Sequence, residues 1–202
     1  MIRNIVFDIG MVLADFRYDA YMREDLGFSD QVVKAFTDRL IKGGIWDELD
    51  LGVRETEDII DEMKSRVSEY PKEAEAFFDG MIDIIRTYPY SKPWIESLKA
   101  RGYKVYLLSN YPRDAYKMHE AKHFDFASVV DGKVISGIER MSKPDPRIYR
   151  LLCERYSLIP GECVFLDDRE VNIKAAIAEG MQGIVFTSYE DAREKLEEIL
   201  KK

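Results

Sequence analysis

The chain has 202 residues, of which 46% are hydrophobic and 34% are charged, and its formal net charge at pH 7 is −8. These proportions allow a packed core together with a small additional domain, and they argue against a disordered chain. The negative charge argues against nucleic acid or an anionic membrane as the main partner, although a small anionic substrate can still bind at a locally positive site.

The first expected strand, residues 2–7, is followed by about seventy residues with helical patterns. Ser29 can cap a helix over residues 32–41, and two further helical runs cover residues 56–67 and 72–88, each ending before a proline. We therefore predict a small helical bundle inserted after the first strand. It should lie over the carboxyl edge of the sheet, where α/β proteins bind ligands.

Strand and helix patterns alternate over the rest of the chain. Residues 104–108, 163–166 and 183–186 are nearly continuous in apolar side chains, which is typical of strands covered on both faces. A helical run after the second of these ends at Gly180, and Ser188 begins another with a capping-box arrangement. The alternation predicts an α/β fold with a doubly wound, mostly parallel, Rossmann-like sheet.

The predicted domain division places residues 1–15 and 88–202 in the α/β core and residues 16–87 in the helical cap. No apolar stretch is long enough to span a bilayer, and the first residues lack the length and cleavage site of a signal peptide. We therefore expect a cytoplasmic location. The two cysteines, Cys153 and Cys163, are interpreted as buried apolar residues rather than as a disulfide or a metal pair.

Polar side chains stand at the ends of three expected strands. Asp8 follows the first, Ser109 and Asn110 follow the second, and Asp167 and Asp168 follow the third. A carboxylate in this position can act as a nucleophile, and a hydroxyl beside free backbone N–H groups can bind phosphate. Two adjacent acids offer oxygen ligands for a hard cation such as Mg²⁺.

Lys143 adds a positive charge on a loop stiffened by Pro144 and Pro146. Taken singly, each of these polar residues has an ordinary structural role. Strand-end Asp and Ser residues form turns or cap helices, and Lys-Pro is common in surface turns. Taken together and in order, they supply the nucleophile, hydroxyl, cation and metal ligands that phosphoryl transfer requires.

These motifs resemble those of the haloacid dehalogenase-like (HAD) hydrolases over essentially the whole chain. Four motifs match in order: VFDIG, YLLSN, SKPDP followed by RIY, and VFLDD followed by Asn172. The inserted helices resemble the small helical cap that this family places after the first motif. The resemblance implies a Mg²⁺-dependent phosphatase in which Asp8 is the nucleophile and forms an aspartyl-phosphate.

The resemblance also implies roles for the other strand-end residues. It implies phosphate binding by Ser109, Asn110 and Lys143. It implies metal ligation by Asp8, the backbone carbonyl of Gly10, Asp167 and Asp168, the last directly or through a water. The acidic pair favours the phosphatases of the family over its metal-free dehalogenases.

Gly10 stands where the family usually has a second aspartate, which serves as the general acid/base. A smaller branch has glycine there and includes bacterial α-glucose-1-phosphatase, and this chain resembles that branch at residues 46–52 and 147–149 as well. The resemblance therefore implies a sugar phosphate, such as a sugar 1-phosphate, as the substrate. Asp15 is the nearest remaining carboxylate and is a candidate acid/base, with a surface or hinge position as the alternative.

His119 and His123 form the H-E-x-x-H pattern of zinc sites on an expected helix. Their neighbours are strongly polar, and no motif supplies a third ligand. We therefore expect a solvated helix face rather than a zinc site.

Three functions stay open at this point. The first is a phosphatase that acts on a small phosphorylated metabolite, without nucleic acid or membrane as a partner. The second is a phosphomutase, against which Gly10 argues because a mutase must return the phosphoryl group to the sugar with the help of an acid/base. The third is a catalytically degenerate binding protein, against which the intact Asp8, Lys143 and Asp167 argue. The sequence leaves the oligomeric state open.

Overall fold

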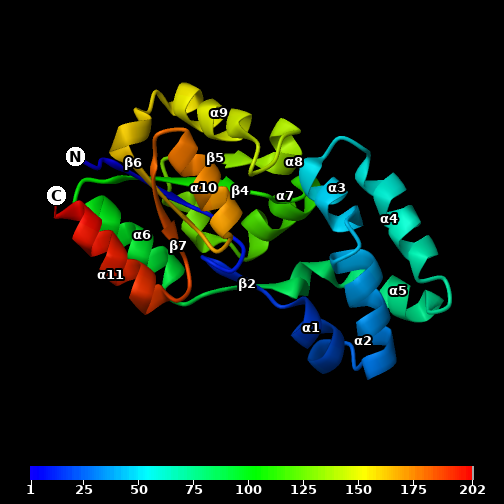
Figure 1. The fold of residues 1–202 in the computed structure, drawn as a ribbon. Coiled ribbons are helices and arrows are strands. Elements are labelled where there is room, and N and C mark those ends of the chain that lie inside the picture. Colours follow the sequence, from blue (N-terminus) through cyan, green and yellow to red (C-terminus); the bar gives the residue numbers. More distant parts are fainter. Residues whose placement is uncertain (202) are drawn as a thin grey trace.

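The computed structural model describes residues 1–201. At its centre is a sheet of five parallel strands in the order β5-β4-β1-β6-β7 (Figure 1). The strands are β1 (Asn4–Phe7), β4 (Lys104–Ser109), β5 (Gly132–Ile135), β6 (Cys163–Asp167) and β7 (Gln182–Val185). This parallel sheet between helices confirms the predicted α/β, Rossmann-like fold.

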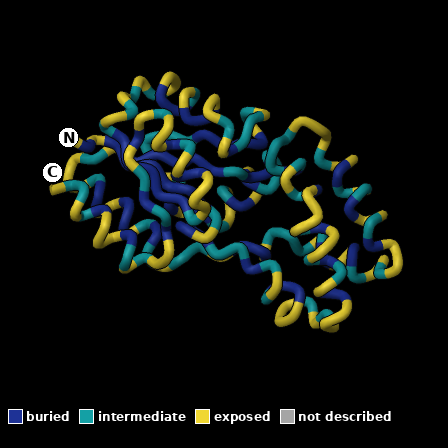
Figure 2. The backbone as a smooth tube through the Cα atoms, viewed as in Figure 1, coloured by how far each residue is buried: buried dark blue, intermediate teal, exposed yellow. Residues whose placement is uncertain are grey.

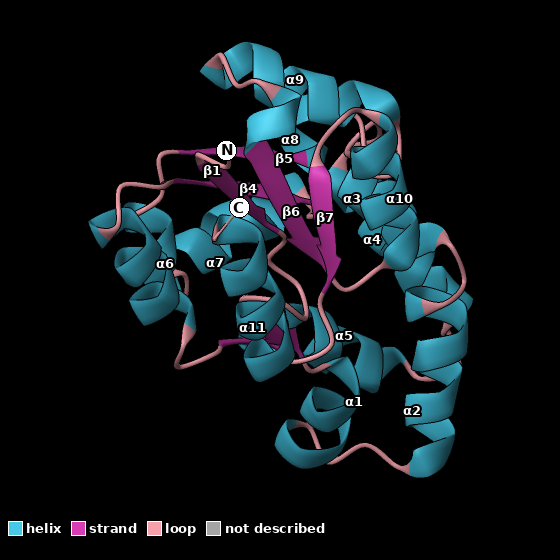
Figure 3. Ribbon diagram, turned by 60° about the vertical axis from the view of Figure 1, so that its left-hand side comes forward, coloured by secondary structure: helices cyan, strands magenta, loops and turns pink. Residues whose placement is uncertain are grey.

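Helices cover both faces of the sheet, which explains why its strands are apolar throughout (Figures 1 and 3). Ile5 and Phe7 of β1 belong to one buried core and Val6 belongs to the other. The first core is completed by α6 (Ser91–Ala100), α7 (Arg113–Lys122) and α11 (Tyr189–Leu200). The second is completed by α9 (Pro146–Tyr156) and α10 (Glu170–Ala178). Figure 2 shows the strands as a continuous buried centre.

A group of short helices lies beside this sheet (Figure 1). These are α1 (Tyr18–Ala20), α2 (Asp30–Phe36), α3 (Ile45–Leu51), α4 (Thr56–Arg66) and α5 (Pro71–Asp79). The π-helical segments Tyr21–Asp25 and Thr37–Ile41 continue α1 and α2. The helices pack on one another through buried side chains such as Phe36 and Phe77, whose ring centroids are 5.5 Å apart.

Two short antiparallel strands, β2 (Ala14–Phe16) and β3 (Ile85–Thr87), connect this helical group to the sheet. The predicted helix over residues 72–88 is therefore wrong at its end. Helix α5 stops before Gly80, a 3-10 turn follows at Met81–Ile84, and the chain then becomes extended. Pairing with β2 satisfies the backbone there and outweighs the local helical pattern.

Helix α3 contacts the short helix α8 (Ser136–Glu139), which follows β5. The hydroxyl of Ser136 donates to the carbonyl of Asp50 in the last turn of α3. Gly52 ends α3 at a φ of +65°, and a Cβ at this position would collide with the backbone of Gly137. A glycine is thus required both for the left-handed conformation and for the close approach of the two backbones.

Other local predictions can be compared with the structure directly. Ser188 caps α11 by accepting from the Asp191 N–H at 3.2 Å, and Gly180 follows α10 at a φ of +88°. Both cysteines are buried and free. Short 3-10 turns also occur at Asp125–Ser128 and Pro160–Glu162. Within residues 1–201, no helix combines the length and apolar character needed to cross a membrane.

Candidate active site

Three neighbouring strands bring the predicted polar residues to one edge of the sheet. Strands β4, β1 and β6 are adjacent and parallel, so their carboxyl ends meet. Asp8 directly follows β1, Asp167 ends β6, and Asp168 is the next residue. These three acids each offer an oxygen within 4.8 Å of the others.

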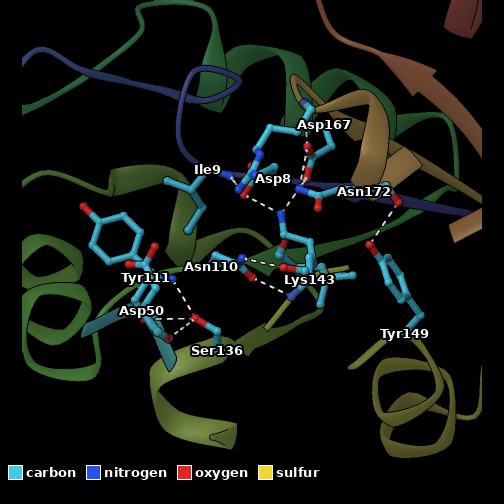
Figure 4. A network of polar contacts seen from close by, with 12 residues as sticks. Asp8, Ile9, Asp50, Asn110, Tyr111, Ser136, Lys143, Tyr149, Asp167 and Asn172 are labelled. Carbon is cyan, nitrogen blue, oxygen red and sulfur yellow. Dashed lines mark hydrogen bonds and ion pairs between the residues drawn. The ribbon is translucent and has the colours of Figure 1, made fainter. Parts of the chain in front are cut away.

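The ammonium group of Lys143 lies between two of these acids (Figure 4). Its Nζ is 2.9 Å from Asp8 Oδ1 and 2.6 Å from Asp167 Oδ2, and it donates to the Leu108 carbonyl at 2.9 Å. The side chain is 1% exposed. Burial lowers the pKa of Lys143, but the charges of Asp8 and Asp167 outweigh this effect and raise it. The lysine therefore stays charged at neutral pH.

Asn110 and Ser109, at the end of β4, serve different purposes. Asn110 Oδ1 accepts from the Lys143 N–H at 2.8 Å, and its Nδ2 donates to the Lys143 carbonyl at 2.9 Å. Its amide thus holds the lysine loop in place. The Ser109 hydroxyl is buried and makes no hydrogen bond to any residue from 1 to 201. Because an unsatisfied buried hydroxyl is costly, this position suits a phosphate oxygen.

The acids carry more negative charge than one lysine compensates. Burial raises the pKa of Asp8 to about 7, the charge of Lys143 opposes this shift, and the charge of Asp167 adds to it. Burial and then the charge of Asp167 also raise the pKa of Asp168. A divalent cation would relieve this repulsion, and a set of carboxylate oxygens is the kind that Mg²⁺ prefers.

Asn172 orients Asp167. Its Nδ2 lies 3.0 Å from both carboxylate oxygens of Asp167, and the Arg169 N–H donates to Asp167 Oδ1 at 2.8 Å. The Tyr149 hydroxyl donates in turn to the Asn172 carbonyl at 2.9 Å. Asn172 and Tyr149 both stand in the sequence motifs, but the sequence alone assigned no role to either. Their places within the motifs were the signal by which the sequence could have identified them as site residues.

A cavity of about 200 Å³ adjoins Asp8. Asp8, Lys143 and Asp168 line it, and so does Gly10, the predicted carbonyl ligand. Several apolar side chains of the helical group and its connecting segments line it as well: Phe16, Trp46, Met81, Ile84 and Ile85. The inserted segment and the sheet edge thus share one site.

Asp15 is not brought to this cavity. It lies in β2, opposite Arg86 of β3. Successive side chains of a strand point to opposite sides, and the next residue, Phe16, lines the cavity whereas Asp15 does not. Asp15 thus stands in the strand that connects the helical group to the sheet, and this position lends no support to an acid/base role.

His119 is buried, contrary to the expected solvated face. Its Nε2 is 3.2 Å from the Met81 carbonyl, which can only accept, so Nε2 carries the proton. Nδ1 therefore accepts from the Tyr111 hydroxyl at 2.7 Å. Both ring nitrogens of His119 are thus used within the protein, which gives this histidine a structural role and leaves neither of its nitrogens free for zinc. The sequence did not indicate these partners because Met81 is distant in the chain and Tyr111 lies just before the start of α7, outside the helical pattern.

The burial of His119 predicts a measurable pH dependence of stability. Burial lowers the pKa of His119, so below pH ~6.5 the unfolded chain binds a proton that the native protein does not. Stability should therefore fall as the pH falls, by at most ~1.4 kcal/mol per pH unit from this group. In urea unfolding between pH 7 and 5, the free energy of unfolding of His119→Gln should fall less steeply with falling pH than that of the natural protein. Identical slopes would contradict a buried, neutral His119.

Comparisons with known proteins agree with the sequence motifs. A family model described as haloacid dehalogenase-like hydrolase matches residues 2–180. The chain is 25% identical over 182 residues to a sesquiterpene phosphatase of Aspergillus oryzae, covering 90% of this chain and 88% of that protein. It is 27% identical over 216 residues to a D-ribitol-5-phosphate phosphatase of Bacteroides thetaiotaomicron, covering 99% of both.

The fold is also found among solved structures. A HAD family enzyme of Bacteroides thetaiotaomicron, solved in complex with magnesium and inorganic phosphate, superposes with a TM-score of 0.74. It is 21% identical, and the match covers 95% of this chain and 98% of that one. At this identity the likeness concerns the fold.

Proposed function

This chain belongs to the haloacid dehalogenase-like hydrolases, and we propose that it is a magnesium-dependent phosphatase with Asp8 as its nucleophile. The observation that carries the proposal is the meeting of Asp8, Lys143 and Asp167 at one sheet edge, beside the unsatisfied hydroxyl of Ser109. The family match confirms the predicted family, and it confirms the prediction that the protein is an enzyme of that family. The phosphatases among the relatives support the proposed reaction.

In the proposed mechanism, a carboxylate oxygen of Asp8 attacks phosphorus while the bond from phosphorus to the ester oxygen breaks, which forms an aspartyl-phosphate and releases the organic product. Lys143 neutralises a phosphoryl oxygen, and the hydroxyl of Ser109 donates to another. Lys143 is held for this task by the two hydrogen bonds between its backbone and Asn110. Water then attacks phosphorus, the bond between phosphorus and the Asp8 oxygen breaks, and inorganic phosphate and the free Asp8 are released.

The metal would be held by oxygen ligands that the structure already groups. Asp8, Asp167 and Asp168 fit a hard cation, and we propose the carbonyl of Gly10 as a further ligand. Bound Mg²⁺ supplies positive charge that offsets the charge of the phosphoryl group. Asn172 keeps Asp167 in a fixed orientation toward this site.

We also propose that residues 16–87 act as a cap over a core formed by residues 1–15 and 88–202. Supporting this, Phe16, Trp46 and Met81 of the inserted segment line the same cavity as Asp8. Enclosure by these side chains would keep bulk water from the reacting groups. The intact nucleophile, lysine and acidic pair favour an enzyme over a degenerate binding protein, and the cytoplasmic location stays a prediction.

Two substrate classes compete for this site. The resemblance of the sequence predicts a sugar phosphate such as a sugar 1-phosphate, and the relative that acts on D-ribitol 5-phosphate supports a polyol phosphate. The apolar lining of the cavity favours an ester whose organic part is itself apolar, because sugar hydroxyls placed against Trp46, Ile84 or Ile85 would lose hydrogen bonds. The similarity to a sesquiterpene phosphatase supports this second candidate.

Phosphate release from a panel of esters tests the function and separates the two candidates. We expect turnover of p-nitrophenyl phosphate that requires Mg²⁺ and is abolished by EDTA. An apolar substrate site predicts that geranyl or benzyl phosphate has a higher kcat/KM than glucose 1-phosphate and glucose 6-phosphate. The reverse order would favour the sugar phosphate. Absence of Mg²⁺-dependent phosphate release from every ester would contradict the proposed function.

A further inference from the structure

The proposed reaction needs a proton donor that the first motif does not supply. An ester oxygen that leaves as an alkoxide is a poor leaving group, and a positioned acid typically accelerates such a step by ~10²–10⁴-fold. Gly10 has no side chain, and a Cβ built there would meet no heavy atom within 4 Å. No neighbouring side chain fills that position, and Asp15 lies outside the cavity. The donor must therefore come from another part of the site.

Asp50 is a carboxyl group that enters this cavity from the helical group. It lies in the last turn of α3 and lines the cavity together with Asp8. It is not part of the three-acid cluster that suits a metal. Within residues 1–201 its side chain makes no hydrogen bond or ion pair, whereas Glu48 of the same helix pairs with Arg54 at 2.8 Å. Because the Asp50 carboxyl group lines the cavity and has no partner among the residues that the structure describes, it is free to exchange a proton with a bound substrate.

The backbone of Asp50 is anchored to the sheet side of the molecule, so its position relative to Asp8 is defined. Ser136 Oγ donates to the Asp50 carbonyl and accepts from the Tyr111 N–H at 2.8 Å (Figure 4). Tyr111 follows Asn110, which holds the Lys143 loop. The close approach of Gly52 to Gly137 fixes the end of α3 at the same place. These contacts link Asp50 to the phosphate-binding loops.

The surroundings of Asp50 favour its protonated form. Burial raises its pKa to about 8, and the charges of Asp47 and Asp8 act in the same direction. Lys143 and Arg169 oppose the shift without cancelling it. A carboxyl group that keeps its proton at neutral pH beside an ionisable nucleophile is the arrangement that acid catalysis requires.

We propose that Asp50 is the general acid/base of this enzyme and replaces the aspartate that is missing at Gly10. The proposal rests on the proposed phosphatase function. As the bond from Asp8 to phosphorus forms and the bond from phosphorus to the ester oxygen breaks, the Asp50 proton moves to that oxygen. The organic product leaves as a neutral alcohol, and Asp50 is left as a carboxylate.

The second half of the reaction restores the starting state. The Asp50 carboxylate takes a proton from the attacking water while the water oxygen bonds to phosphorus. The bond between phosphorus and the Asp8 oxygen breaks, which frees inorganic phosphate and the Asp8 carboxylate. Asp50 is thereby protonated again, and no further reactant is needed.

Leaving-group dependence in Asp50→Asn tests this assignment. We expect kcat/KM for benzyl phosphate to fall by ~10²–10⁴-fold, because benzyl alcohol leaves poorly without a proton. For p-nitrophenyl phosphate the loss should be less than ~10-fold, because p-nitrophenolate leaves without help. Hydrolysis of the aspartyl-phosphate would lack its base, so p-nitrophenol should appear in a burst followed by a slow phase.

Control variants separate proton transfer from other effects. Asp58→Asn makes the same change from carboxyl to amide at an exposed position of α4 and should leave the ratio of the two kcat/KM values as in the natural protein. Asp50→Glu keeps a carboxylic acid and should recover more activity on benzyl phosphate than on p-nitrophenyl phosphate, relative to Asp50→Asn. If Asp50→Asn fails to fold, Asp50→Glu against Asp50→Ser provides the same comparison.

Two outcomes would overturn the assignment of Asp50. An equal loss on both esters would mean that Asp50 only positions the cap, and an unchanged kcat/KM on both would mean that another group donates the proton. Failure of the proposed function would be recognised separately, because the natural protein would then turn over neither ester with Mg²⁺.

Discussion

Replacing Asp8 by asparagine should lower kcat for every phosphate ester by at least ~10³-fold, because an amide cannot form the covalent intermediate. The change is nearly isosteric. The amide oxygen of the new side chain can still accept from the Ile9 N–H, which bonds Asp8 Oδ1 at 2.7 Å in the natural protein, and from Lys143. Loss of activity would therefore reflect lost chemistry rather than a lost fold.

The stability of the same variant provides a check on folding. Because burial raises the pKa of Asp8 to about 7, the charged carboxylate costs stability as the pH rises above the value of an unfolded aspartate. Without Mg²⁺ at pH 8, Asp8→Asn should thus be at least as stable as the natural protein. Denaturant unfolding and phosphate release would be measured in parallel, with the exposed Asp58→Asn as control. Near-normal turnover in Asp8→Asn would remove Asp8 from the mechanism.

The sequence predicted the central strands well because burial on both faces gives a strand a recognisable local sequence pattern. A strand covered on both faces is a short continuous apolar run, as in residues 163–166, and β6 lies there. β5 was missed because Gly132 and Lys133 interrupt the apolar pattern at the edge of the sheet. The three-residue strands β2 and β3 were missed because each is too short to show a period and depends on a partner about seventy residues away.

Some residues of the site were likewise predictable from the sequence, and others were not. Asp8, Ser109 and Asp167 were predictable because a parallel sheet brings the ends of neighbouring strands together whatever the details of packing. Asp50 was not, because its approach to the cavity depends on how α3 packs against α8. That contact requires Gly52 to meet Gly137, and the two glycines are far apart in the sequence. The pairing of His119 with Tyr111 likewise became visible only when the chain was folded.

Replacing Lys143 by methionine should have a large effect on both activity and stability. The lysine is buried between Asp8 and Asp167, and methionine keeps much of its length while removing the charge. Removing one partner of a buried ion pair typically costs ~3–5 kcal/mol, because the remaining charges lose their compensation. Turnover should fall by at least ~10²-fold, since no other lysine or arginine contacts Asp8 within residues 1–201.

The effect of Mg²⁺ on the stability of Lys143→Met distinguishes the loss of the lysine charge from a simple packing defect. If the two carboxylates repel each other once the ammonium is gone, Mg²⁺ should stabilise Lys143→Met more than it stabilises the natural protein, because the cation replaces the missing charge. Urea unfolding at pH 8 with EDTA or with Mg²⁺ measures this difference. Lys174→Met removes an exposed lysine paired with Glu170 at 2.9 Å and should change stability by less than ~1 kcal/mol in either condition. Equal stability of Lys143→Met and the natural protein in EDTA would contradict the role of Lys143 as the counter-charge of Asp8 and Asp167.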